Sequence, residues 1–156
     1  MSASKTAGVG LKIVAHLRDG KLIKGFADAS LAAPAEAASN SHDLPPTLLL
    51  RSPDQRQHQV DLASLKALFF VKSFEGRHDY SEVKFFSSQP QMQGIWVRIV
   101  FQDGEVCEGV VYNSLGFLIH PGFFLKPPDP HSNNEMVWVA KASLTEFRVL
   151  GIRNSY

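Results

Sequence analysis

The sequence predicts an all-β protein made of two tandem small β-barrel units, each of about five strands, that arose by internal duplication. Three observations predict this fold. An Asp-Gly pair stands between apolar-alternating segments at Asp19-Gly20 and again at Asp103-Gly104. Short β-rich segments ended by proline recur along the chain. Blocks of similar sequence appear twice in the same order.

The repeated blocks indicate the duplication. Residues 13–26 read IVAHLRDGKLIKGF, and residues 97–110 read VRIVFQDGEVCEGV. The later blocks that match in the same order are 50–54 with 125–129 and 63–65 with 142–144. Three blocks in one order, separated by loops of different length, are typical of a repeated structural unit.

Each Asp-Gly pair predicts a β-hairpin. Glycine, and often aspartate, can adopt the positive φ that a type I′ turn requires. Before the second turn, Val97, Ile99 and Phe101 alternate with less apolar residues, as expected for a strand with one buried face. Gly25 and Gly109 fall within the following strands, where glycine often marks a bulge or bend that lets a short sheet curl.

The remaining strands are predicted at matching places in the two units. The third strands are expected near 47–51 and 122–126, the fourth near 58–62 and 136–139, and the fifth near 67–72 and 146–150. A single helical turn is expected before each fifth strand, at 62–65 and 140–143. A hairpin followed by three further strands is typical of a small barrel.

These elements give the predicted domain organisation. Residues 1–10 form an N-terminal tail, 11–72 the first barrel unit, 73–94 a connector and 95–153 the second unit. Within the first unit, residues 27–46 are rich in alanine and interrupted by proline, which predicts a flexible insertion. The connector contains several aromatic residues, so we expect it to pack against the barrels.

Composition narrows the class of protein. The hydrophobic content of 44% and charged content of 20% are those of a soluble globular chain. The formal net charge of +1 provides no strong global attraction to nucleic acid or to an anionic membrane. A single cysteine, Cys107, excludes an internal disulfide, and no apolar run is long enough to span a bilayer. We therefore expect a cytoplasmic protein without a membrane partner.

No pattern of catalytic or metal-binding residues is apparent. The six histidines lack the spacing of a zinc site, and neither a Gly-x-Ser-x-Gly elbow nor a phosphate-binding glycine loop occurs. Residues 129–135 offer oxygen ligands, but their spacing matches no calcium loop, and Asp and Asn also stabilise turns. We expect no catalytic residue, no cofactor and no metal, and hence a protein that is not an enzyme.

Two blocks resemble a known family. FFVKSFEGRHDY, at 69–80, and GFFLKPPDPHSNNEMVWVAKASLTEFRVL, at 122–150, are similar to an uncharacterised bacterial domain family. The resemblance implies tandem Sm-like small β-barrel units, found alone or beside PilZ and other signalling domains. It implies a regulatory role in bacterial signalling but no particular activity.

The connector supplies the candidate interaction surface, because charged and aromatic side chains gather where the two units meet. Its candidate residues are Lys72, Phe74, Glu75, Arg77, His78, Tyr80, Phe85 and Phe86. The alternative interpretation is a structural joint held by ion pairs, since exposed charge clusters often contribute little energy.

We therefore expect a non-enzymatic adaptor or regulatory module whose partner is another protein. One alternative is a small-barrel protein that binds RNA or single-stranded nucleic acid by stacking bases on aromatic residues. A second is a nucleotide second-messenger binder, although Arg51 and Arg56 do not have the Arg-x-x-x-Arg spacing of PilZ domains. Unpaired strand edges would also favour a homodimer.

Overall fold

The computed structural model describes residues 10–27, 42–76 and 83–153. In these ranges the elements are β1 (Lys12–Leu17), β2 (Leu22–Ala27), β3 (Thr47–Arg51), β4 (Gln57–Asp61), η1 (Leu62–Ser64), β5 (Leu65–Val71), β6 (Gly94–Phe101), β7 (Val106–Val111), α3 (Leu115–Ile119), β8 (Gly122–Lys126), β9 (Asn134–Ala140), η2 (Lys141–Ser143) and β10 (Leu144–Arg153). The predicted all-β class is confirmed. Most of the insertion predicted at 27–46 lies outside the described residues.

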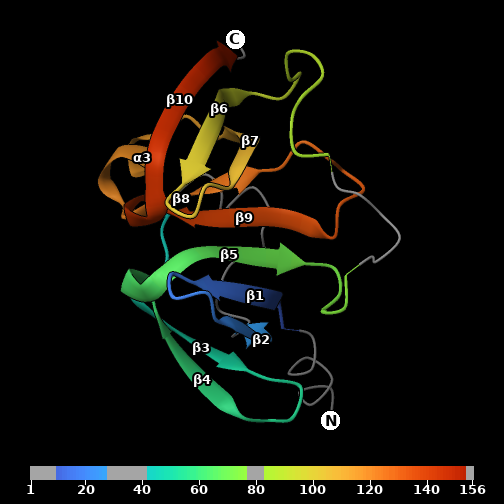
Figure 1. Cartoon of the computed structure of the whole chain (residues 1–156), viewed down its shortest axis with the longest axis vertical. Coiled ribbons are helices and arrows are strands. Elements are labelled where there is room, and N and C mark those ends of the chain that lie inside the picture. Colours follow the sequence, from blue (N-terminus) through green and yellow to red (C-terminus); the bar gives the residue numbers. More distant parts are fainter. Residues whose placement is uncertain (1–9, 28–41, 77–82, 154–156) are drawn as a thin grey trace.

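All ten strands belong to one antiparallel sheet with the order β10-β6-β7-β8-β9-β5-β1-β2-β3-β4, and this sheet does not close into a barrel (Figure 1). The prediction of two duplicated barrel units is therefore wrong. The halves, β1–β5 and β6–β10, are joined edge to edge because β5 pairs with β9, with Ala67 opposite Val139 and Val71 opposite Asn134. In a closed barrel, the edge of β5 would form its main-chain hydrogen bonds within its own unit. Here β5 forms these hydrogen bonds with β9 of the other half.

The strands at this joint bury both faces. Successive side chains of a strand point to opposite faces, so Leu68 and Phe70 of β5 enter one core while Ala67 enters the other. In β9, Met136 and Trp138 belong to the first core and Val137 and Val139 to the second. The sheet therefore carries its two cores on opposite faces. This explains the continuous apolar runs in β5, β8 and β9, because a strand buried on both faces has no polar side to alternate with.

Both predicted hairpins are present, but their turns are of another type. β1 pairs with β2 and β6 with β7 across the Asp-Gly pairs. Gly20 and Gly104 have φ values of 94° and 93°, whereas neither aspartate has a positive φ. The aspartates instead accept hydrogen bonds from the main-chain N–H groups of Lys21 and Glu105. Three-residue loops with a left-handed glycine replace the predicted type I′ turns.

Other local predictions can be compared directly with the structure. β3 and β8 have the predicted bounds, and the helical turns expected before the fifth strands are η1 and η2. Gly25 and Gly109 pair in regular register with Ile13 and Val97, so neither marks a bulge. The helix α3 was not predicted. Within the described residues, no helix has the length and apolarity needed to cross a bilayer.

His42, which precedes β3, links the two halves from a fully buried position. Its Nδ1 accepts a hydrogen bond from the N–H of Phe124 at 3.0 Å, and its Nε2 lies 2.8 Å from the carbonyl of Tyr112. A main-chain N–H only donates and a carbonyl only accepts, so these partners require a neutral ring with its proton on Nε2. Burial lowers the pKa of His42, which agrees with a neutral ring.

Candidate interaction surfaces

The connector surface proposed from the sequence is described only in part. Lys72, Phe74, Glu75, Phe85 and Phe86 lie within the described residues, and Arg77, His78 and Tyr80 lie outside them. Phe74 packs edge-on against Phe26 of the first half, with ring centroids 5.2 Å apart. Phe86 packs against Trp96 of the second half at 6.2 Å.

These contacts divide the connector between the two halves. Lys72 donates a hydrogen bond to the carbonyl of Pro130, and Glu75 is exposed. Phe85 is 44% exposed, and its ring centroid lies 6.0 Å from the guanidinium of Arg98. The described aromatic residues therefore anchor the connector at separate places. Whether residues 72–86 act together as an interaction surface stays a prediction.

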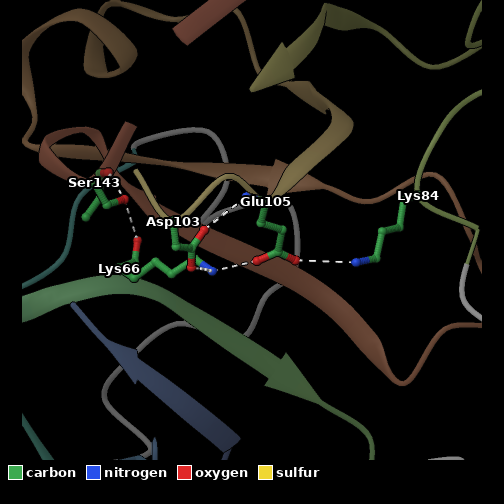
Figure 2. Close-up of polar contacts among 6 residues, drawn as sticks. Lys66, Lys84, Asp103, Glu105 and Ser143 are labelled. Atoms are coloured by element: carbon green, nitrogen blue, oxygen red, sulfur yellow. Dashed lines mark hydrogen bonds and ion pairs between the residues drawn. The ribbon is translucent and has the colours of Figure 1, made fainter. Parts of the chain in front are cut away.

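A charged cluster ties β5 to the turn between β6 and β7, as Figure 2 shows. Nζ of Lys66 lies 2.7 Å from Asp103 Oδ2 and 2.5 Å from Glu105 Oε1, and Lys84 reaches the other oxygen of Glu105 at 3.5 Å. Lys66 is only 14% exposed, and its ammonium also lies over the ring of Phe101. The cluster thus joins a strand of the first half to a hairpin of the second.

The pKa values of this cluster follow from the ion pairs. Burial opposes the charge of Lys66, but hydrogen bonds from its ammonium to Asp103 and Glu105 outweigh burial and raise its pKa. Burial likewise raises the pKa of Glu105, yet Lys66 and Lys84 together lower it below its ordinary value. The hydrogen bond from Lys66 lowers the pKa of Asp103. All three groups are therefore charged at neutral pH.

Lys66→Met is expected to lower the free energy of unfolding by about 1 kcal/mol at pH 7, a modest loss because both carboxylates are partly exposed and solvent screens them. Asp103 and Glu105 have lower pKa values in the folded protein than in the unfolded chain. Their ion pairs therefore stabilise the fold at a pH above the unfolded-state pKa values, and this stabilisation is lost as the pH falls through the folded-state pKa values. The difference between the variant and the wild type should therefore shrink in acid. Urea unfolding across a pH series measures it, and a difference that is constant with pH would contradict the ion-pair interpretation.

Glu108 of β7 holds the connector on the sheet. Its side chain is only 3% exposed and accepts hydrogen bonds from Arg98, from Nε1 of Trp96 at 3.2 Å and from the N–H of Phe86 at 3.0 Å. Nη2 of Arg98 lies 2.7 Å from Oε2. Burial raises the pKa of Glu108, but these donors outweigh burial and lower the pKa overall. This role has no signal in the sequence, because a glutamate on a strand usually faces solvent.

The polar residues of the loop at 129–135 bond the main chain. Asp129 is buried and accepts hydrogen bonds from the N–H groups of Val83 and His131. Asn133 bonds both the N–H and the carbonyl of Ser73. Across the described residues, no group of three His, Cys, Asp or Glu side chains is placed to hold a metal ion. The loop thus organises its own turn and fastens the start of the connector.

The short helix α3 presents the most exposed apolar residues near the second core. Leu115, Leu118 and Ile119 are 68%, 70% and 65% exposed, and no residue of the helix is buried. Phe117 faces the other way and packs against Phe123 and Phe147. We call Leu115, Leu118 and Ile119 the α3 surface. A contiguous apolar patch of this kind is typical of an interaction site.

An open pocket of about 300 Å³ lies beside α3. The rings of Phe117, Phe123 and Phe147 line it, with centroids 5.3 to 5.5 Å apart. Leu144, Thr145 and Glu146 complete the lining, and the carboxylate of Glu146 pairs with Arg148. Lys141 also lines it, with its ammonium 5.3 Å from the ring of Phe117, and burial lowers the pKa of this lysine. By contrast, the cavity that Cys107 lines measures only about 40 Å³, which is too small for most ligands.

The helix α3 has a signal in the sequence, although its exposure does not. Leu115-Gly116-Phe117-Leu118-Ile119 is an apolar run between Ser114, a residue favoured at helix starts, and Pro121, which stops a helix. The exposure of that run could not be found, because apolar periodicity over five residues does not distinguish a buried segment from an exposed one.

Comparisons with known proteins identify a family but no activity. Residues 9–151 match the model of a family of unknown function, DUF6982. Neither a curated protein nor a solved structure matches the chain. The match confirms that the chain belongs to an uncharacterised family, as the resemblance implied. It gives no support to Sm-like units. The association with PilZ and other signalling domains stays a prediction. Because the match covers most of its length, the chain belongs to the DUF6982 family of unknown function.

Proposed function

We propose that this chain is a non-enzymatic adaptor module that binds another protein through the α3 surface and the adjoining pocket. The observation that carries the proposal is the exposure of Leu115, Leu118 and Ile119, each at least 65% exposed on a helix of five residues. Large exposed aliphatic side chains beside an aromatic pocket provide the apolar centre that protein interfaces require.

The chemistry of the pocket specifies the partner segment. The aromatic rings favour an apolar side chain, which would lose its contact with water on entering the pocket. Among the described residues Lys141 has no ion-pair partner, and its ammonium bonds the carbonyl of Phe117 instead. A carboxylate near this ammonium would gain a charge-assisted hydrogen bond. The proposed ligand is therefore a peptide segment with an apolar anchor residue flanked by Asp or Glu.

The polar interior supports a binding role over a catalytic one. The buried polar or charged residues among those described are His42, Glu108, Asp129, Ser132 and Ser143. Each makes hydrogen bonds within the fold, to main-chain groups or to neighbouring side chains. Groups held in this way serve packing and turn formation, whereas a catalytic group must face a substrate.

Leu118→Glu is expected to abolish binding of such peptides, because it places a charge in the apolar contact and repels the acidic flank. The free energy of unfolding should change by less than about 0.5 kcal/mol, since Leu118 is largely exposed. The measurement is fluorescence anisotropy against two peptide libraries with the same apolar anchors, one flanked by Asp and Glu and the other by Lys and Arg.

Leu49→Glu is the matched control, because Leu49 is 57% exposed on β3 and lies in the other half of the chain. It should bind the acidic library as the wild type does. Equal binding by Leu118→Glu, or a preference of the wild type for the basic library, would contradict the proposal. Salt-sensitive retention of RNA oligonucleotides without any peptide binding would favour nucleic-acid recognition instead.

A further inference from the structure

The strand β10 forms one end of the sheet with an exposed edge. Among the described residues it pairs only with β6. Its register with β6 shifts between Leu144 and Glu146 and again between Val149 and Gly151, so Glu146–Val149 is a regularly paired segment between two irregularities. Val149 and Ile152 are more than half exposed. An unpaired strand edge offers a row of main-chain N–H and C=O groups to another strand.

We propose that two copies of this chain pair through β10, antiparallel and about a two-fold axis at Phe147. In this register Glu146 of each copy lies opposite Arg148 of the other, and the two Phe147 residues face each other. The partner is thus a second copy of this chain, and the contact is isologous, the commonest symmetry among oligomers. Glu146 and Phe147 also line the pocket beside α3, so the dimer contact adjoins the proposed binding site. The oligomeric state is measured without peptide, so the two proposals are tested separately.

The charges of β10 favour this register. Glu146 and Arg148 lie on one face of the strand and form an ion pair at 3.3 Å within one copy. Phe147 is opposite Ile99 of β6, a residue of the second core, so it points to the other face. Pairing at Phe147 would set two glutamates and two arginines in alternation on one face. On the other face it would bring two aromatic rings together.

Neighbouring registers lack this complementarity. Moving the axis to Arg148 sets arginine against arginine, and moving it to Glu146 sets glutamate against glutamate. Like charges directly opposite each other destabilise a strand pair. An axis between two residues would place the charged side chain of Glu146 or Arg148 opposite the apolar Phe147. The bulges on both sides confine regular pairing to this charged segment and oppose longer sheet extension.

The joint inside the chain shows why β10 of one copy should not pair with β4 of another. At the joint, Ala67 and Phe69 of β5 face the core of the other half. If β10 paired with β4 of another copy, the positions equivalent to Ala67 and Phe69 would be taken by Thr145, Glu146 and Arg148. The opposing strand β4 carries mainly polar residues, Gln57, Gln59 and Asp61. Head-to-tail pairing would therefore desolvate charges without partners.

The dimer is expected to depend on concentration, because so short a paired segment buries far less than the roughly 1,200–2,000 Å² of stable interfaces. Sedimentation velocity over a concentration series at low salt tests it. Glu146→Arg and Arg148→Glu should each weaken the dimer by about tenfold or more, since each variant sets like charges opposite each other twice. An equimolar mixture of the two variants should restore it as a heterodimer, and so should the double variant E146R/R148E.

Arg153→Glu is the control, because it changes the same charge on the same strand beyond the second bulge. It should leave the dimer unchanged, and the melting temperatures of all variants should agree. A wild type that stays monomeric, single variants that dimerise as tightly as the wild type, a mixture that does not recover, or an equal loss in Arg153→Glu would each overturn the proposal. Larger species that grow with concentration would overturn it in favour of pairing between β10 and β4.

Discussion

Trp138→Ala is expected to lower the free energy of unfolding by about 3–5 kcal/mol, a large part of the roughly 5–15 kcal/mol of a typical domain. Trp138 lies on β9 of the second half, yet it is 1% exposed in the core of the first half. Its ring packs so closely over Gly122 that a Cβ at that position would collide with it. Its Nε1 donates a hydrogen bond to the carbonyl of His42.

This variant also tests whether the halves fold as one. Because Trp138 fills the first core from the second half, the variant should unfold in a single transition at a lower urea concentration. Trp96, the remaining tryptophan, reports on the second half by fluorescence, while circular dichroism reports on the whole sheet. The two signals should coincide. Leu49→Ala, at an exposed site on β3, is the control and should change little.

Two separated transitions, or a Trp96 signal unchanged while circular dichroism reports partial unfolding, would contradict this prediction. Such a result would show that each half is stable alone, as expected for the independent units predicted at 11–72 and 95–153. The edge-to-edge pairing of β5 with β9 argues for cooperative unfolding, since losing either strand exposes both faces of the other.

Glu108→Ala is expected to lower the free energy of unfolding by about 2–4 kcal/mol. The substitution leaves Nε1 of Trp96 and the N–H of Phe86 without their acceptor, and it removes the carboxylate that pairs with Arg98. The loss should be smaller than that of a fully buried ion pair, because the Arg98 side chain is 41% exposed and water can solvate it.

The stabilising contribution of Glu108 is expected to depend on pH. The pKa of Glu108 in the folded protein lies below its ordinary value of 4.5, so its stabilising contribution is present above that value and is lost as the pH falls through the lowered pKa. The difference between the wild type and Glu108→Ala should therefore shrink in acid. Amide hydrogen exchange at Phe86 should also become faster.

Glu135→Ala, which removes an exposed carboxylate from β9, is the matched control and should change the free energy of unfolding by less than about 0.5 kcal/mol. If Glu108→Ala were equally mild, the four hydrogen bonds to Glu108 would contribute little, and the connector would be held by other contacts. If the exchange rate of Phe86 stayed the same, the carboxylate would not be what anchors it.

Some candidate sites have a signal in the local sequence, whereas others arise only from strand pairing. The connector was singled out from its composition, and the structure shows Phe74 and Phe86 packed against separate halves. The charged groups that join distant strands, Lys66 with Asp103 and Glu108 with Arg98, were not predicted. Their partners become neighbours only through strand pairing, and no sequence spacing encodes that pairing.

The all-β class, both hairpins, the bounds of β3 and β8, and the 3-10 turns before β5 and β10 could be predicted from local sequence. Each of these depends on neighbouring residues: a glycine that accepts positive φ, an apolar alternation, a proline that ends a strand. The joining of the two halves into one sheet could not be predicted in this way. A strand edge makes the same main-chain hydrogen bonds with any partner, so the choice between closing a barrel and joining β5 to β9 depends on side chains packing on both faces at once.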